Sequence, residues 1–346
     1  MATSPDDRRA RLSDIAAQAG VSEATVSRVL NDRPNVAAGT RATVLTALDV
    51  LGYDRPTRLR TKAVSLVGLI VPELSNPVFP AFAQAVETSL ARRGLTPVLC
   101  TQTLDGIHED EYVEMLLDRG VAGLICISGQ HADTHTGVER YRRLRDQGLP
   151  LVLVNGYREG VDATFVSADD AAAMDLAVTH LVELGHRRIG LAVGQDRYVP
   201  VQRKVAGFVA STERRLGLTA DDAPALVVRS LFTIEGGASA AQTLIERGAT
   251  AVVCGSDVMA LGVIRQARAM GLRVPEDLSV VGYDDSPLMG FTDPPLTTIR
   301  QSVAAMGQAA ASALVAEVHG EPGPRTELVF APELVVRRST AGVPRS

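Results

Sequence analysis

The stretch that most constrains the fold is LSDIAAQAGVSEATVSRVLN, residues 12–31, near the start of the chain. Its apolar spacing predicts two short amphipathic helices with a tight turn between them. Gly20 suits the turn because glycine adopts positive φ, and Ser22 suits the N-cap of the second helix. With Ala16 as a small contact residue and Val26 as a core residue, the offsets predict a helix-turn-helix. A generic helical hairpin, which the alanine content alone would allow, is the alternative.

The second helix of this unit is expected to bury one face and expose the other. The inward residues expected from the spacing are Ile15, Val21, Val26, Val29 and Leu30. The DNA-contacting residues predicted on and beside the outer face are Ser22, Glu23, Ala24, Thr25, Ser27, Arg28 and Asn31. Arg28 can donate to guanine, Glu23 can accept from cytosine N4, and Ala24 can contact a thymine methyl group. Thr25 and Ser27 are expected on phosphates, which position the protein without specifying a sequence.

Charge is distributed unevenly along the 346 residues, whose formal net charge is −5. Residues 1–62 contain ten Lys and Arg against seven Asp and Glu, a net of +3, which leaves −8 for the remainder. Local excess of positive charge, not the total, decides attraction to nucleic acid. We therefore expect a DNA-attracting N-terminal part and a larger acidic body.

From residue 64 onward the pattern changes to short β-branched runs that alternate with amphipathic helical stretches. Alternation of this kind predicts parallel sheets that are covered by helices on both faces. Two such series, one before and one after about residue 168, predict two similar lobes. The expected fold class is an all-α helix-turn-helix headpiece followed by a two-lobed α/β core with parallel sheets.

Residues 14–31 match without a break the pattern D-[IV]-A-x-x-A-G-V-S-x-x-T-V-S-R-V-[LV]-N of the lactose-repressor (LacI/GalR) family. The chain also resembles this family at GLIVPELSNPVF (68–79), HLVELGHRRIGLA (180–192), LSVVGYDD (278–285) and PPLTTIRQ (294–301). The resemblance implies a core like that of periplasmic binding proteins. It also implies a homodimeric repressor that binds a pseudo-palindromic double-stranded DNA operator and is controlled by a small-molecule effector.

The domain boundaries that follow are a headpiece at 1–53, a hinge linker at 54–63 and a core at 64–340, with one lobe at about 64–167 and 300–322 and the other at about 168–299 and 323–340. In the family the linker forms a short hinge helix on DNA, and a leucine enters the minor groove. The matching residues here are Arg58, Leu59 and Arg60. Because this linker is a few residues shorter than the usual one, a disordered basic tether is the alternative.

The resemblance places the effector in the crevice at the carboxyl ends of the strands, where open α/β lobes gather their loops. The effector-binding residues that it implies are Val78, Phe79, Asn155, Arg203, Lys204, Phe232, Ser256 and Asp284. Lys204 replaces the arginine with which the family grips its effector, and a lysine cannot reproduce the guanidinium fork. For Phe79 and Phe232 ordinary core packing is the alternative.

The residue types favour a sugar-like effector, because a carboxylate, an amide and a cation can hold hydroxyl groups while a phenylalanine covers an apolar ring face. The segments RPTRLR and RKVAGF are similar to those of actinobacterial regulators of maltose-type sugar uptake. A purine or another non-sugar corepressor is the alternative, although Val78 stands where a second stacking aromatic would be expected.

Two other function classes are disfavoured by missing motifs. A sugar-handling enzyme with a DNA-binding module would need a phosphate loop, and the sequence contains no G-x-x-x-x-G-K-[ST]. A periplasmic solute-binding protein would need a signal peptide, whereas the start MATSPDDRRARL is polar and no apolar run reaches the length of a membrane span. We expect a cytoplasmic regulator that is not an enzyme.

Weaker signals for metal or catalytic chemistry are also present. His131, His135 and Asp133 could hold a metal, but a solvated loop is the alternative. Asp284 and Asp285 could act as paired acids, yet such a strand end also suits a sugar hydroxyl. The three widely spaced cysteines, expected to be small buried residues, are Cys100, Cys126 and Cys254. We expect no metal and no cofactor.

Overall fold

The structure is a computed structural model that describes residues 12–30, 36–51, 65–102, 107–218, 225–321, 323 and 325–343. The chain divides into two compact units, residues 1–64 and 65–346, and each is described by itself. Four of the predicted DNA-contacting residues lie outside the described residues: Asn31, Arg58, Leu59 and Arg60. Across the described ranges, no helix is both long enough and apolar enough to cross a membrane.

Within its described residues, the first unit contains three short helices, α1 (Leu12–Ala19), α2 (Glu23–Leu30) and α3 (Ala38–Val50). Gly20 takes a φ of 64°, which turns the chain between α1 and α2 as predicted. The Oγ of Ser22 accepts a hydrogen bond from the amide of Thr25 at 3.2 Å and so caps α2. Val26 and Val29 of α2 are fully buried against α1 and α3. The predicted helix-turn-helix is therefore present.

The first lobe of the second unit is built on a six-stranded parallel sheet with the order β11-β5-β4-β3-β1-β2. Its strands are β1 (Ser65–Val71), β2 (Leu95–Thr101), β3 (Gly123–Ile127), β4 (Leu151–Val154), β5 (Thr164–Ala168) and β11 (Glu327–Phe330). Apolar side chains of α4 (Val78–Ala91) and α12 (Val303–Val318) cover one face. Those of α5 (Glu109–Asp118) and α6 (Glu139–Asp146) cover the other.

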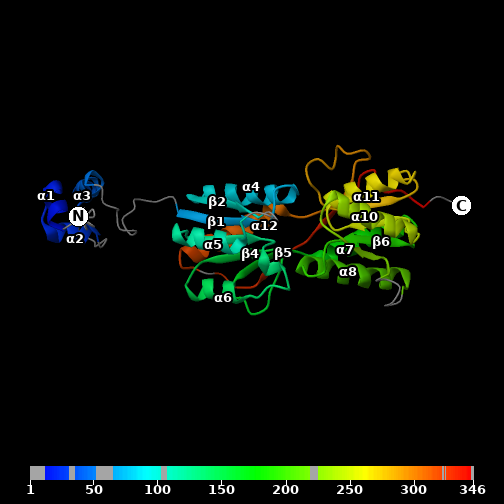
Figure 1. Ribbon diagram of the computed structural model, residues 1–346, viewed down its shortest axis with the longest axis horizontal. Coiled ribbons are helices and arrows are strands. Elements are labelled where there is room, and N and C mark those ends of the chain that lie inside the picture. The colour runs from blue at the N-terminus through cyan, green and yellow to red at the C-terminus, as the bar shows by residue number, and fades with distance from the viewer. Residues whose placement is uncertain are drawn as a thin grey trace, which may run out of the picture. The chain divides into compact units, whose positions relative to one another are not determined.

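The second lobe repeats this plan with the strand order β12-β10-β9-β8-β6-β7, in which only β12 is antiparallel to its neighbour among the described strands. Its strands are β6 (Ile189–Val193), β7 (Val227–Arg229), β8 (Ala251–Cys254), β9 (Ser279–Asp284), β10 (Thr297–Arg300) and β12 (Glu333–Val335). The helices α7 (Asp170–Glu183) and α8 (Val199–Leu216) cover one face. The helices α10 (Ile234–Glu246) and α11 (Asp257–Ala269) cover the other (Figure 1). The predicted two-lobed α/β core with parallel sheets is confirmed.

The chain crosses between the lobes after β5, after β10 and after β11 (Figure 1). The prediction that residues 323–340 belong to the second lobe is wrong for residues 327–330, because β11 pairs with β5 in the first lobe. The apolar runs of the sequence predict first-lobe strands at 65–71, 97–100, 123–128 and 149–154, and β5 at 164–168 is not among them. Each crossing joins a strand end of one lobe to the other, so the carboxyl edges of the two sheets face a shared cleft.

Candidate functional site

The outer face of α2 is the candidate DNA-contacting surface of the first unit. Glu23, Ala24 and Arg28 are exposed, and Thr25 and Ser27 are half-buried. Because the opposite face of α2 is packed in the core, these five side chains share the remaining surface of one helix. A cation and a carboxylate on an eight-residue helix supply both donors and acceptors for base edges.

Ser22 has a different position from the other predicted DNA contacts. Its Oγ lies 2.9 Å from the Oγ1 of Thr25, in addition to accepting the Thr25 amide. Ser22 thus closes the first turn of α2, which leaves it exposed beside the helix N-terminus. The hydroxyl of Ser22 is thus engaged in capping, beside the outer face of α2.

In the second unit, the residues predicted from the first lobe lie where strands end. Asn155 follows β4 with a φ of 61°, and its Nδ2 donates to the Oγ of Ser128 at 3.3 Å. Val78 and Phe79 open α4, which follows β1. Val78 is buried in the core of the first lobe, and Phe79 is half-buried and packs against that core. Core packing therefore occupies much of the surface of both.

In the second lobe, Phe232 follows β7 and Ser256 follows β8, so both lie at the carboxyl ends of strands. A Cβ atom added to Gly194, which follows β6, would lie 2.0 Å from the ring of Phe232. The half-buried ring thus covers the strand end and also packs against the apolar core. Ser256 is buried, and its Oγ accepts the amide of Met259 at 3.2 Å as the N-cap of α11. The hydroxyl of Ser256 is thereby engaged in capping.

Asp284, the last residue of β9, is the side chain that most clearly points to a ligand. It is 7% exposed, and its Oδ1 accepts a hydrogen bond from the Nε2 of Gln301 at 2.7 Å. Its Oδ2 is buried and has no hydrogen-bond partner among the described residues. Burial raises the pKa of Asp284 well above its usual range, and the neighbouring Asp257 raises it further. A buried carboxyl oxygen without a partner is costly unless something else binds it.

Lys204 does not point a free ammonium into the cleft. Its Nζ lies 2.6 Å from Oδ1 of Asp170 and 3.9 Å from the centre of the Tyr283 ring. The hydroxyl of Tyr283 donates to the same Asp170 oxygen at 2.6 Å. The side chains of Lys204 and Asp170 are 6% and 7% exposed. Lys204, to which the resemblance gave an effector-binding role, thus forms an ion pair inside the second lobe.

Arg203 joins the two lobes. Its two terminal nitrogens lie 2.6 and 3.0 Å from the two carboxylate oxygens of Glu327, which belongs to β11 of the first lobe. This two-pronged geometry is the strong form of a guanidinium–carboxylate pair. Arg203 and its neighbour in sequence are therefore both engaged with carboxylates of the chain itself.

Another contact between the lobes was not predicted. The amide of Thr134, in a loop after β3, donates to the carbonyl of Arg197 at 2.7 Å. The guanidinium of Arg197 in turn lies 3.4 Å from a carboxylate oxygen of Asp133. The fully buried carboxylate of Glu109 stabilises this first-lobe loop, because it accepts a hydrogen bond from the amide of Gln130 at 2.8 Å. No sequence motif indicated this contact, because it joins two loops 63 residues apart.

The metal hypothesis does not fit the position of His131. This side chain is fully buried, and its Nε2 is 3.0 Å from the carbonyl of Val154. Burial lowers the pKa of His131 to about 4. The described part of the chain contains no group of His, Cys, Asp and Glu that could hold a metal ion. The cysteines, predicted to be buried, are buried and unpaired: Cys100, Cys126 and Cys254.

A cavity of about 380 Å³ opens between the lobes, in the size range of small-molecule sites. Val78 and Asp284 line it from opposite lobes, together with Gln301 and Arg300 at the crossing after β10. The structure therefore brings a first-lobe and a second-lobe member of the predicted effector set to one cavity.

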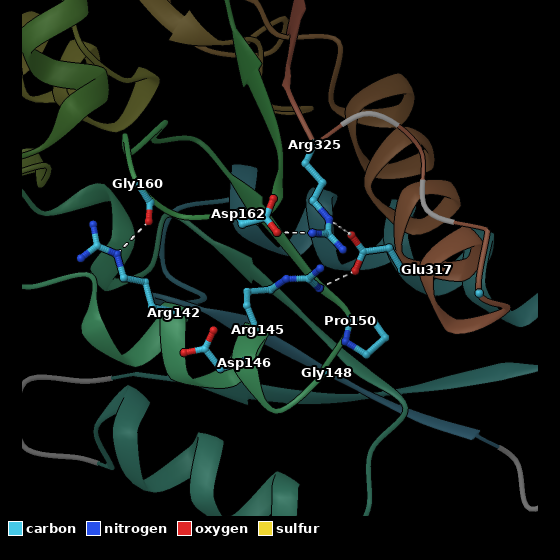
Figure 2. Close-up of a pocket in the computed structure, with 10 residues that line it drawn as sticks. Arg142, Arg145, Asp146, Gly148, Pro150, Gly160, Asp162, Glu317 and Arg325 are labelled. Carbon is cyan, nitrogen blue, oxygen red and sulfur yellow. Dashed lines mark hydrogen bonds and ion pairs between the residues drawn. The ribbon is translucent and has the colours of Figure 1, made fainter.

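A larger cavity, of about 590 Å³, lies at the opposite, amino-terminal edge of the first-lobe sheet (Figure 2). Ion pairs lie in it: Arg145 contacts Glu317 at 2.6 Å, and Arg325 contacts Asp162. None of the predicted effector residues lines it. The cavity between the lobes is thus the better candidate site.

Comparison with known proteins agrees with this two-part arrangement. Residues 11–56 match the family described as bacterial regulatory proteins, lacI family, and residues 178–340 match the periplasmic binding protein-like domain. The chain is 63% identical over 335 residues to the HTH-type transcriptional regulator MalR of Streptomyces coelicolor, covering 96% of this chain and 97% of MalR.

Two solved structures are similar over nearly the whole chain. One is a transcriptional regulator CelR–cellobiose complex, with a TM-score of 0.71 and 32% identity, covering 96% of this chain and 100% of that one. The other is a lac repressor dimer bound to operator and the anti-inducer ONPF, with a TM-score of 0.72, 28% identity and the same coverage.

Proposed function

The chain belongs to the lacI family of bacterial regulatory proteins and is a DNA-binding transcriptional regulator, and from this premise we propose that it is a homodimeric repressor controlled by a small sugar bound between its lobes. Its targets would be genes of sugar uptake or catabolism. The proposed role is binding rather than catalysis, and it places the protein in the cytoplasm with the DNA.

The observation that carries the effector site is Asp284. Its buried Oδ2 lacks a protein partner, and the residue lines the cavity between the lobes. A ligand hydroxyl would satisfy this oxygen, and a ligand large enough to reach Val78 would contact both lobes. The similarity to a regulator solved with cellobiose supports a sugar as this ligand.

The DNA-binding step follows from the geometry of α2. Each headpiece would insert α2 into a major groove, and two headpieces would bind half-sites about one helical turn apart. One headpiece makes few contacts, so a dimer supplies the affinity that an operator requires. The similarity to a repressor dimer solved on its operator supports this assembly.

Coupling between the two sites requires that the sugar favour one arrangement of the lobes. The Arg203–Glu327 pair and the Thr134–Arg197 hydrogen bond both join the lobes and would break if the lobes moved apart. A ligand that contacts both lobes would strengthen the arrangement that has these contacts. Such coupling is typically worth about 1–3 kcal/mol, or roughly 5–150-fold in DNA affinity. We favour induction, in which the sugar weakens operator binding.

The experiment that tests this proposal begins with selection of DNA fragments by the full-length protein. The selected operator is then titrated with protein at fixed salt, with and without glucose, maltose or cellobiose, and with hypoxanthine as the purine comparison. We expect at least one sugar to weaken operator binding. No effect of any sugar, combined with tighter binding in hypoxanthine, would show that the effector assignment is wrong.

A further inference from the structure

We infer that the effector of this chain carries no negative charge, so that the cleft takes an uncharged sugar and rejects phosphorylated sugars and sugar acids. The inference rests on the proposed function, because it concerns the ligand of the same cleft. It adds the charge class of that ligand. Three independent features of the described cleft support it: its cations, its helix N-termini and its carboxylates.

The cations that could hold an anion are already bound to carboxylates. Lys204 is paired with Asp170, and Arg203 is paired with Glu327 through both terminal nitrogens. An anionic ligand would have to displace a carboxylate that is held at 2.6 Å in a largely buried site. The two side chains that would suit an anion by sequence are therefore not available to one.

The cations farther along the cleft edge are also engaged. Arg300, which lines the cavity, lies 2.7 Å from Asp285 and 2.9 Å from Glu333. Arg197 pairs with Asp133. Arg158 donates to the carbonyl oxygens of Asp133 and Thr136 at 2.6 and 3.0 Å, which directs its guanidinium into the loop after β3. These three arginines stabilise loops and strand ends of the protein itself.

Helix N-termini are the second feature that a phosphate would use, because their free amides bind anions. At the carboxyl edges of the sheets, side chains of the chain itself occupy these positions at α4, α7, α10 and α11, and at α4 the Oδ1 of Asn76 accepts the amide of Val78 at 3.3 Å. The N-terminus of α12, which also lines the cavity, has no side-chain cap among the described residues. Asp169 accepts the amide of Ala172 at 2.9 Å in α7, and Thr233 accepts that of Gly236 at 3.0 Å in α10. Ser256 does the same in α11. At α7 the capping group is a carboxylate, which would repel an approaching anion.

Carboxylates are the third feature. Asp257 is buried next to Asp284, and its two oxygens accept the Thr298 hydroxyl at 2.6 Å and the Ser286 amide at 2.7 Å. Asp284 retains a buried oxygen without a protein partner. Burial raises the pKa of Asp257 to about 6, so this carboxyl is ionised at neutral pH. An ionised carboxylate about 5 Å from a ligand anion, at an effective dielectric near 20, weakens binding by roughly 100-fold or more per charge. A hydroxyl group, in contrast, can donate to Asp284 when it is ionised and accept from it when it is protonated.

The test compares matched ligands by isothermal titration calorimetry on the full-length protein. The pairs are glucose, maltose and cellobiose against their 6-phosphates, with adenosine against adenosine 5′-phosphate as a pair outside the sugars. We expect each uncharged member that binds to do so at least about 100-fold more tightly than its phosphate. A phosphorylated sugar that binds as tightly as its uncharged partner overturns the inference but leaves a sugar-controlled regulator intact.

The same titrations distinguish failure of the proposed function. Binding of adenosine but of no sugar would contradict the sugar proposal and support an uncharged effector. Binding of no compound in either form would contradict both.

A variant tests whether the preference for an uncharged ligand comes from the Lys204–Asp170 ion pair rather than from the shape of the cleft. Asp170→Asn removes the carboxylate that neutralises Lys204 but keeps an oxygen that can accept from Tyr283. We expect it to narrow the preference for the uncharged sugar by about 10-fold or more, because a free ammonium becomes available to the phosphate. Asp175→Asn is the matched control on the same helix: Asp175 pairs with Arg214 and Arg215, and the wild-type preference is expected to remain. An unchanged preference in a folded Asp170→Asn protein would overturn the charge-pairing argument, and the wild-type titrations decide the inference whether or not this variant folds.

Discussion

Lys204→Met is the substitution that most directly tests whether this lysine supports the second lobe or grips the effector. Methionine has nearly the same length and keeps most of the apolar packing of the lysine stem. It removes the ammonium that lies 2.6 Å from Asp170 and 3.9 Å from the centre of the Tyr283 ring. The carboxylate of Asp170 then remains in a site that leaves only 7% of its side chain exposed.

The expected magnitude follows from this burial. Removing one partner of a buried ion pair typically costs about 3–5 kcal/mol, because the other charge is left uncompensated. We therefore expect Lys204→Met to lower the free energy of unfolding of the second unit by about 3 kcal/mol or more. Asp170→Asn in the Lys204→Met background removes the remaining charge and keeps an acceptor for the Tyr283 hydroxyl. The double variant should regain at least about 2 kcal/mol relative to Lys204→Met.

The assay is urea unfolding followed by far-UV circular dichroism on wild type, both single variants and the double variant. The coupling between the two positions is obtained from the double-mutant cycle. Additive effects within about 0.5 kcal/mol would refute the buried ion pair. So would a Lys204→Met protein of wild-type stability that has lost sugar binding, since that result would return Lys204 to the effector.

Four further substitutions, one of them with a matched control substitution, test separate parts of the structure. Ser22→Ala removes the cap of α2 and should lower headpiece stability by about 1 kcal/mol, measured as thermal unfolding at 222 nm. Gly262→Ala would place a Cβ atom 2.0 Å from a backbone oxygen of α10, so α10 and α11 must separate, and we expect a loss of about 1–3 kcal/mol in urea unfolding. Gly39→Ala, in open space on α3, is its control and should be neutral or stabilising. His131→Gln removes a side chain whose pKa is about 4 in the folded protein and about 6.5 in the unfolded chain. As the pH falls from 6.5 to 4, the unfolded wild-type chain gains a proton that the folded chain does not. The free energy of unfolding of wild type should therefore fall by about 3 kcal/mol relative to that of the variant. Arg28→Ala should weaken operator binding by about 10–100-fold in fluorescence anisotropy at fixed salt, with a smaller effect on random DNA.

Each of these outcomes can fail in a recognisable way. Wild-type stability of Ser22→Ala would mean that the cap contributes nothing, and equal effects of the two glycine substitutions would mean that the close helix approach is not required. A difference between wild type and His131→Gln that does not change with pH would contradict a buried, neutral histidine. Equal losses on operator and random DNA would reduce Arg28 to a phosphate contact.

The helix-turn-helix could be predicted because its signals are local. A turn glycine, a capping serine and apolar residues one helical turn apart act within twenty residues, and Gly20, Ser22 and Val26 are found in the positions expected of them. The alternation of strands and helices likewise determines parallel, doubly covered sheets, because each element needs an apolar face against its neighbours.

The strand at 164–168 could not be recognised as easily, because Thr164 and Ser167 interrupt its apolar character although both are buried. The lobe to which β11 belongs depends on its pairing with β5, about 160 residues earlier, and sequence proximity to β12 suggested the wrong lobe. Pairing between distant segments is set by tertiary packing, which spacing along the chain does not encode.

In the candidate cleft, too, some features could be predicted from the sequence and others depend on contacts between distant residues. The family resemblance implied Asn155 and Asp284, and both lie at strand ends, where open α/β lobes gather their binding loops. The partners of Lys204 and Arg203 lie 34 and 124 residues away and determine whether these cations are free. A charged residue at a family position is therefore insufficient to assign a ligand contact, because its neighbours in space decide its role.

The central claim, a DNA-reading headpiece controlled by a ligand-sensing core, is tested most directly by one binding comparison. Operator affinity is measured by fluorescence anisotropy for the full-length protein and for residues 65–346, each with and without the sugar that binds the cleft. We expect the full-length protein to bind the operator and to be weakened roughly 5–150-fold by the sugar, and residues 65–346 to bind the sugar but not the operator. Equal operator affinity of the two proteins, or a full-length protein that binds the sugar with no change in operator affinity, would contradict it.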